Sequence, residues 1–130
     1  QGYSSAASDV YKRQDVHAMR EAAGYLVGEH DFKSFCSIHA QVETTVRRIY
    51  ALTVDKKKDI ITIRITGNGF LYNMVRIIAG TLIRVGTGEY KPEQIPEILA
   101  AKDREMAGPT APAHGLTMIG IEYEDLEEKS

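Results

Sequence analysis

The pattern of hydrophobic and polar residues is clearest between residues 60 and 86. Isoleucines at 61, 63 and 65 alternate with polar residues, which predicts a strand with one buried face. After a glycine-rich turn at 67–69, apolar residues recur at helical spacing and predict a helix over residues 70–86. Gly86 and Gly88 are suited to end that helix.

A second helix is predicted upstream, over residues 15–27. Asp15 is a typical helix N-cap, an apolar stripe follows it, and a glycine comes directly after the last apolar residue. Residues 29–41 have no clear period, and we interpret them as a loop that Phe32 and Phe35 pin to the core.

The remaining segments complete the pattern. Residues 45–54 and 60–66 are strand-like, and the lysines at 56–58 make a polar turn between them, which predicts a hairpin. Pro92 marks the first turn of a further helix that ends near Ala101. A loop over residues 105–115 and a last strand over residues 116–123 follow. This order predicts an α+β fold in which a mainly antiparallel sheet carries helices on one face.

Length and composition fit one domain. The chain has 130 residues, of which 43% are hydrophobic, and its best apolar run, at 77–83, is far too short to span a membrane. Its one cysteine, Cys36, excludes an internal disulfide and fits a reducing, cytoplasmic setting. We expect residues 1–14 to be a non-native or disordered leader, residues 15–125 to form the domain, and residues 126–130 to be a frayed acidic tail.

The charge pattern leaves RNA binding open. The formal net charge is −2, but five acidic residues and one lysine lie between Glu122 and Lys129, so the body of the chain is close to neutral. A near-neutral body can carry a local basic face. The four histidines show no ligand spacing with one another or with Cys36, so no metal site is predicted.

Arg76 is the residue whose chemistry stands out. It lies among apolar neighbours in the predicted helix, where a guanidinium must reach water or find a carboxylate or phosphate. Gly80, one turn further along the same side, would let another segment approach closely. Two interpretations remain open from the residues alone, an arginine at the edge of a core helix or a site residue.

Four segments of the chain carry motifs. Residues 28–35 fit Gly-x-His-Asp-Phe-x-x-Phe, and residues 45–49 fit Thr-x-Arg-x-Ile. Residues 69–76 read Gly-Phe-Leu-Tyr-Asn-Met-Val-Arg before an apolar run, and residues 101–116 end in Ala-Gly-Pro-Thr-Ala-Pro-Ala-His-Gly-Leu. In this order the segments resemble the tRNA pseudouridine synthase A (TruA) family, over roughly residues 15–123.

The resemblance implies roles for five residues. Arg76 matches the arginine that pairs with the family's catalytic aspartate, and a permanently charged guanidinium would keep that carboxylate ionised in a partly dry cleft. Leu116, with Gly115 before it, matches the apolar wall of the uridine pocket, and Phe70 would line the same cleft. Arg47 matches the strand motif and would contact phosphate. The alternatives are a core residue for Leu116, a buried aromatic for Phe70 and a surface ion pair for Arg47.

The chain also departs from the family. The Arg-x-Asp-Ala-Gly loop that carries the catalytic aspartate is absent, and the active-site tyrosine has no convincing match. The chain therefore resembles the C-terminal half of such an enzyme, one half of a pseudouridine-synthase-like fold, and we expect it to be inactive alone. The resemblance implies tRNA, the N-terminal half and a second copy of the enzyme as partners, with no cofactor, metal or membrane.

Two other functions fit parts of the pattern. The missing aspartate favours a non-catalytic RNA-binding or scaffold module, and composition alone fits a small α+β protein-interaction domain. Among secondary candidates, the lysines at 56–58 fit either RNA contact or a solvated turn. Arg104 fits either a site or a role in holding the closing loop, and His30 is expected to hold its own loop.

Overall fold

The structure of the protein is a computed structural model that describes residues 14–37, 42–112 and 119–126. Its helices are α2 (Val16–Leu26), α3 (Met74–Gly86) and α4 (Gln94–Ala101). Its strands are β1 (Gly28–Asp31), β2 (Val46–Lys57), β3 (Ile60–Gly67) and β4 (Ile119–Asp125). Two short 3-10 helices, η1 (Lys33–Phe35) and η2 (Arg104–Met106), follow β1 and α4.

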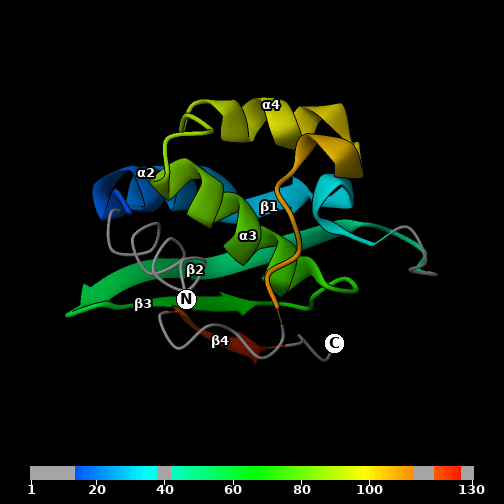
Figure 1. Ribbon diagram of the computed structural model, residues 1–130. Coiled ribbons are helices and arrows are strands. Elements are labelled where there is room, and N and C mark those ends of the chain that lie inside the picture. Colours follow the sequence, from blue (N-terminus) through cyan, green and yellow to red (C-terminus); the bar gives the residue numbers. More distant parts are fainter. Residues whose placement is uncertain (1–13, 38–41, 113–118, 127–130) are drawn as a thin grey trace.

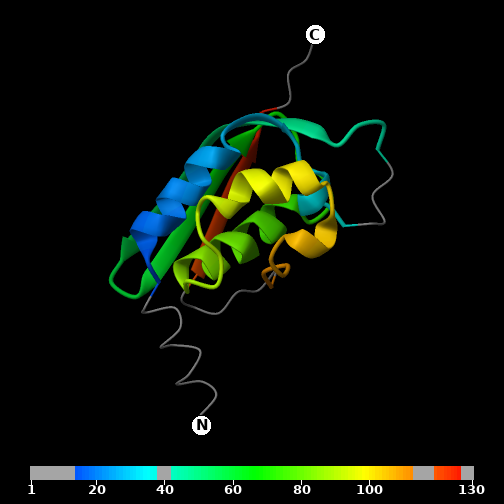
Figure 2. The same ribbon diagram turned by 90° about the horizontal axis from the view of Figure 1, so that it is seen from above.

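In the described part of the chain, the strands form one sheet in the order β1-β2-β3-β4. Strand β2 pairs antiparallel with both β1 and β3, whereas β4 lies parallel to β3. A parallel pair needs a crossover, and α3 and α4 lie in it. The three helices cover the same face of the sheet, as Figures 1 and 2 show from the side and from above. The predicted α+β class is therefore confirmed.

The core lies between the sheet and the helices. Ile61, Ile63 and Ile65 are each at most 1% exposed, as their alternation predicts. Phe32 and Phe35 are also fully buried, which confirms that they pin the segment after β1. The same apolar cluster includes buried side chains of α2 and α3, namely Met19, Ala22, Ala23, Leu26, Met74, Ile77, Ile78 and Leu82.

The helix predicted over residues 15–27 is confirmed as α2, and the helix predicted from Pro92 to near Ala101 is confirmed as α4. The Asp15 carboxylate caps α2 by accepting a hydrogen bond from the Ala18 backbone N–H at 3.0 Å. Gln14, which we grouped with the leader, is buried and packs directly against Gly86 at the end of α3. The packed fold thus includes Gln14, and residues 1–13 lie outside the described residues.

Several boundaries differ from the prediction. Strand β4 ends at Asp125 and not at residue 123, and residues 116–118 of the predicted strand lie outside the described residues. Residues 29–31, predicted as loop, belong with Gly28 to β1, whose Gly-Glu-His-Asp sequence shows no apolar alternation because none of its residues is fully buried. Strand β2 continues through Lys57, which leaves a shorter turn at residues 58–59. Helix α3 begins at Met74 and not at residue 70, because Asn73 has a left-handed φ of 61° that an α-helix does not accommodate.

Residues 107–112, which we call the strap, run from η2 across α3 towards β4 and appear in orange in Figure 1. The strap backbone comes so close to α3 that a Cβ atom at Gly80 would lie 1.7 Å from the Pro109 carbonyl oxygen. The next helical residue, Thr81, accepts a hydrogen bond at its Oγ1 from the Gly108 N–H at 2.9 Å. The close approach expected at Gly80 is therefore confirmed, and the approaching segment is the strap.

We expect Gly80→Ala to destabilise the fold, because the new methyl group meets backbone atoms that cannot turn away. The loss should be about 1–3 kcal/mol in free energy of unfolding, as for other overpacked sites. Denaturant unfolding followed by circular dichroism measures it.

Gly24→Ala is the matched control, since Gly24 also lies inside a helix but has nothing within 4 Å of its Cβ position. That substitution should stabilise by about 0.5–1 kcal/mol, because alanine loses less backbone entropy in a helix. Equal effects of the two substitutions would contradict the close packing of the strap.

Candidate functional site

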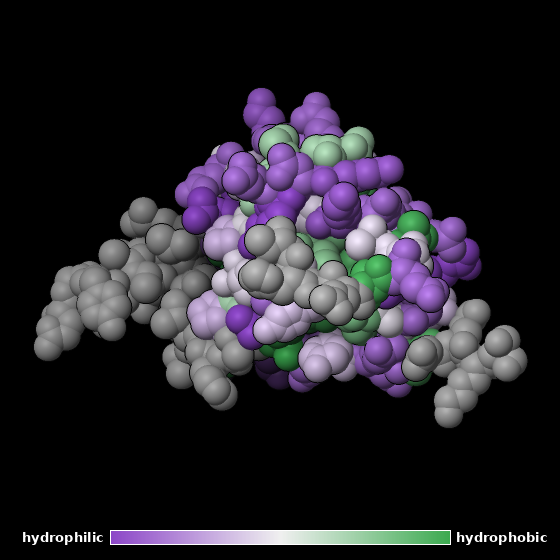
Figure 3. All heavy atoms as spheres, turned by 90° about the vertical axis from the view of Figure 1, so that its right-hand side faces the viewer, coloured by the Kyte–Doolittle hydropathy of each residue, from purple (hydrophilic) through white to green (hydrophobic). Residues whose placement is uncertain are grey.

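A pocket of about 520 Å³ opens between the first turn of α3, the end of the strap and β4. We call it the Arg76 pocket. Its size is in the range of sites for small ligands or a single nucleoside. Figure 3 faces the right-hand side of Figure 1 and shows apolar surface between polar side chains at this end of the molecule. The lining residues are Phe70, Leu71, Asn73, Met74, Val75, Arg76, Pro112, Ile121, Tyr123 and Asp125.

Arg76 lies in the first turn of α3 and is partly buried. Its Nε donates a hydrogen bond to the Ala111 carbonyl at 2.9 Å, and the Ala111 N–H donates to the Arg76 carbonyl, also at 2.9 Å. This pair of bonds fixes the guanidinium against the strap. Among the described residues, no carboxylate lies within ion-pair distance of Arg76.

The Arg76 pocket is suited to an anion. The guanidinium is a permanent charge with a planar fork of donors that matches a carboxylate or phosphate. The N-terminus of α3 adds a partial positive charge at the same place. A cation that is partly shielded from water attracts an anionic group more strongly than the same cation in water does. The carboxylate of Asp125, which also lines the pocket, opposes this attraction.

Phe70 lines the Arg76 pocket, as the resemblance implies for a cleft wall. Its ring meets that of Tyr123 edge to face, with centroids 5.7 Å apart and an interplanar angle of 86°. The Tyr123 side chain is 65% exposed, so the pair leaves aromatic surface open to a ligand. Sequence reasoning missed Tyr123, although the alternation in β4 places it on the same face as Ile121 and so offered a signal.

Arg47 lies in a second, adjoining cavity of about 340 Å³, which shares Phe70 and Asp125 with the Arg76 pocket. One of its terminal nitrogens, Nη1, donates to the backbone carbonyls of Thr44 and Val46. The neighbouring arginine, Arg48, forms instead an exposed ion pair with Glu29 at 3.1 Å. Of the two arginines, Arg47 is therefore the one beside the pocket.

The other predicted site residues are Gly115 and Leu116, and both lie outside the described residues. Arg104 lies in the described part and has the structural role that was one of its two interpretations. Its Nη1 donates to the Gly108 carbonyl at 2.8 Å, and its Nη2 donates to Thr110 Oγ1 at 3.2 Å. Arg104 therefore holds the strap by hydrogen bonds to two of its residues.

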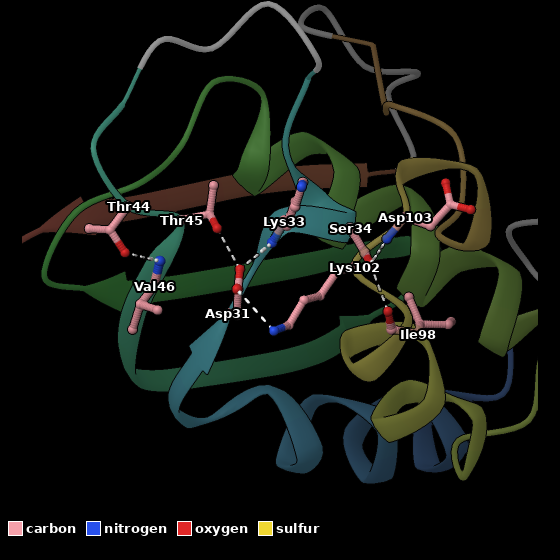
Figure 4. Close-up of polar contacts among 9 residues, drawn as sticks. All are labelled: Asp31, Lys33, Ser34, Thr44, Thr45, Val46, Ile98, Lys102 and Asp103. Atoms are coloured by element: carbon pink, nitrogen blue, oxygen red, sulfur yellow. Dashed lines mark hydrogen bonds and ion pairs between the residues drawn. The ribbon is translucent and has the colours of Figure 1, made fainter.

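The motif at residues 28–35 forms a clamp that holds several elements together (Figure 4). The Asp31 carboxylate accepts hydrogen bonds from Thr45 Oγ1 at 2.5 Å and from the Lys33 N–H at 3.1 Å. Lys102 Nζ lies 3.8 Å from the same carboxylate. The polar atoms of this motif thus join β1, η1, β2 and the end of α4.

Two further residues of this motif, Ser34 and His30, make contacts that hold it in place. Ser34 Oγ donates to the Ile98 carbonyl at 2.7 Å and accepts from the Asp103 N–H at 2.8 Å. His30 Nε2 contacts the Val27 carbonyl at 3.0 Å, and its ring packs edge-on to Phe32. His30 therefore holds the connection between α2 and β1, and the segment that it was predicted to hold as a loop begins with a strand.

Cys36 is buried, and its thiol donates to the Ser37 carbonyl at 3.3 Å. Burial raises the pKa of the Cys36 thiol, and the Tyr72 backbone contact and the charge of Arg47 offset only part of that rise. Within the described residues, no group of three or more His, Cys, Asp and Glu side chains is placed to hold a metal ion. None of the described helices is long and apolar enough to cross a bilayer.

Comparison with known proteins gives a consistent result. A family model described as tRNA pseudouridine synthase matches residues 22–124. A tRNA pseudouridine synthase A from Brevibacillus brevis is 60% identical over 84% of this chain and 45% of its own length. The Bacillus pumilus and Bacillus subtilis proteins of the same name are 53% and 47% identical over 87% and 95% of this chain. The chain spans about half the length of these relatives, at 45–53%.

The burial of Cys36, which directly follows η1, gives a test of how this segment packs. Because the thiolate is the reactive form, a buried thiol with a raised pKa should be alkylated slowly at pH 8. We expect iodoacetamide to react at least about tenfold more slowly with the folded chain than with the chain in guanidinium. The rate should rise with pH. Equal rates in the folded and unfolded chains would contradict the burial.

Proposed function

Because this chain belongs to the tRNA pseudouridine synthase A family, we propose that it forms the C-terminal half of an enzyme that converts uridine to pseudouridine. The proposed substrate is the anticodon arm of tRNA. The observation that carries the proposal is a family motif whose arginine, Arg76, lines a pocket of about 520 Å³ that has both apolar and polar walls.

In the proposed reaction, the bond between the ribose C1′ and the base N1 is broken, and a bond from C1′ to C5 of the same base is formed. C5 loses its proton and N1 gains one. The reaction is an isomerisation, so it consumes no oxidant or reductant. It needs an aspartate, a base flipped out of its stack and a pocket that excludes water. The aspartate would come from the N-terminal half, since no matching motif exists in this chain.

Arg76 is the proposed partner of that aspartate. A carboxylate that loses part of its water on entering the pocket becomes harder to ionise, and a nearby guanidinium lowers its pKa again. Nε of Arg76 is bound to Ala111, so the fork formed by the two terminal nitrogens faces away from that bond and suits a bidentate carboxylate. Arginine does this better than lysine because its donors are planar and fixed.

The surrounding residues have proposed roles as well. Phe70 and Tyr123 provide aromatic surface on which a flipped base can stack. Arg47 is placed beside the same pocket and is proposed to contact a phosphate of the RNA. Gly115 and Leu116 are proposed, from the resemblance alone, to form the apolar wall of the uridine pocket.

The isolated 130-residue chain should form no pseudouridine, because it lacks the aspartate motif. The assay incubates it with unmodified tRNA and measures pseudouridine in the digested product. Adding the N-terminal half of the Brevibacillus brevis relative as a separate chain should restore activity. Pseudouridine above background with the isolated chain would contradict the proposal.

Within that two-chain enzyme, Arg76→Ala should lower the single-turnover rate at least about 100-fold, since a charge at the reacting centre is removed. The affinity for tRNA should change little, because it is spread over many phosphate contacts. Arg76→Lys should also be impaired, because a point charge does not reproduce the fork.

Arg84→Ala is the matched control, since Arg84 is an arginine of the same helix whose side chain pairs with Glu89 at the surface. It should react at the normal rate. A folded Arg76→Ala enzyme with an unchanged rate would remove Arg76 from the site. A two-chain complex that binds tRNA but never forms pseudouridine would favour the non-catalytic RNA-binding module.

A further inference from the structure

We propose that Arg104 is a positioning residue that orients Arg76 through the strap. Arg104 is not among the residues that line the Arg76 pocket. Its influence would pass through the hydrogen bonds of the strap. The proposal rests on the proposed function of Arg76 for its catalytic meaning, whereas the mechanical link rests on the contacts of the described residues.

The first step of the link joins Arg104 to the strap. The two terminal nitrogens of Arg104 bind two different strap residues, Gly108 through its carbonyl and Thr110 through its hydroxyl. Arg104 is itself held, because the preceding residue, Asp103, donates its N–H to Ser34. The guanidinium therefore acts as a brace between a fixed 3-10 helix and the strap.

The second step joins the strap to α3. The Gly108 N–H binds the buried hydroxyl of Thr81, and that hydroxyl donates to the Ile77 carbonyl at 2.8 Å. Between these residues the Pro109 carbonyl sits over Gly80, where no side chain could fit. These contacts fix the distance of the strap backbone from α3 and its position along the helix axis.

The third step joins the strap to the guanidinium of Arg76. Ala111 exchanges two hydrogen bonds of 2.9 Å with Arg76, one to its backbone carbonyl and one from its Nε. Arginine side chains have many rotamers, and a bond at Nε removes most of that freedom. A guanidinium held in one orientation can meet a carboxylate without a further loss of entropy.

Thr110 lies one residue before Ala111. The hydrogen bonds of Arg104 to Thr110 and Gly108 are therefore proposed to limit the motion of the Ala111 backbone. Loss of the brace should leave α3 and the sheet intact, since Arg104 contributes nothing to the buried apolar cluster. The effect should appear at Arg76 before it appears in global stability.

The test measures hydrogen exchange of the Arg76 Nε–H by NMR in the 130-residue chain. We expect Arg104→Gln to accelerate this exchange roughly two- to tenfold, the range that corresponds to the net strength of one hydrogen bond. Arg64→Gln is the matched control, because Arg64 forms an exposed ion pair with Glu122 on the sheet. It should leave the exchange rate unchanged.

A second pair of variants keeps the test informative if Arg104→Gln folds poorly. Thr110→Val has nearly the same shape but loses the acceptor for Arg104, whereas Thr110→Ser keeps it. We expect faster Arg76 exchange in Thr110→Val and a rate near normal in Thr110→Ser. Unchanged exchange in both Arg104→Gln and Thr110→Val, with normal melting temperatures, would overturn the proposal.

The two-chain enzyme gives a readout that a purely structural role would not move. Arg104→Gln should lower kcat roughly 10- to 100-fold, as expected for a misplaced catalytic group, with little change in KM for tRNA. Normal kcat despite faster Arg76 exchange would overturn the positioning role. If Arg76→Ala itself were fully active, the proposed function would fail, yet the NMR result would still decide whether Arg104 holds Arg76.

Discussion

The contact between the strap and α3 is the constraint on which the candidate site depends. Two backbones meet at Gly80 so closely that no side chain fits between them. This approach brings Ala111 within hydrogen-bond distance of Arg76 and places Pro112 in the wall of the Arg76 pocket. Without it, the guanidinium would be one mobile side chain at the end of an apolar helix.

The resulting site has a cation but, among the described residues, no anion paired with it. A partly buried guanidinium is costly unless it is solvated or paired, and one bond to a carbonyl satisfies only part of it. This arrangement fits the proposed half-site, whose carboxylate would come from an N-terminal half. The coverage of about half of each relative agrees with that interpretation.

Much of the fold could be predicted from the sequence because its core elements have strong periods. The alternation at Ile61, Ile63 and Ile65 and the apolar face of α3 both correspond to buried residues. Strand β1 was missed because an edge strand with partly exposed faces leaves no period, and only its pairing with β2 defines it. The start of α3 was misplaced because propensity does not reveal the left-handed conformation of Asn73.

The site was predictable only in part. The resemblance selected Arg76, Phe70 and Arg47, and the structure places all three around two adjoining cavities. The contact that orients the Arg76 guanidinium was not predictable, because it joins a side chain to the backbone of a residue 35 positions away. Tyr123 was missed since its partner ring, Phe70, is distant in sequence. The roles of Gly115 and Leu116 stay predictions.

The central claim is that Arg76 is held ready for a carboxylate from the missing half. The most direct measurement is the NMR signal of the Arg76 guanidinium as the N-terminal half of the Brevibacillus brevis relative is added. Adding the half that carries its motif aspartate should change the chemical shift of the Arg76 guanidinium signal. It should also slow the hydrogen exchange of the Arg76 side-chain protons further. The same half with asparagine at that position should bind but leave them as in the isolated chain. Identical spectra with both halves would contradict the claim.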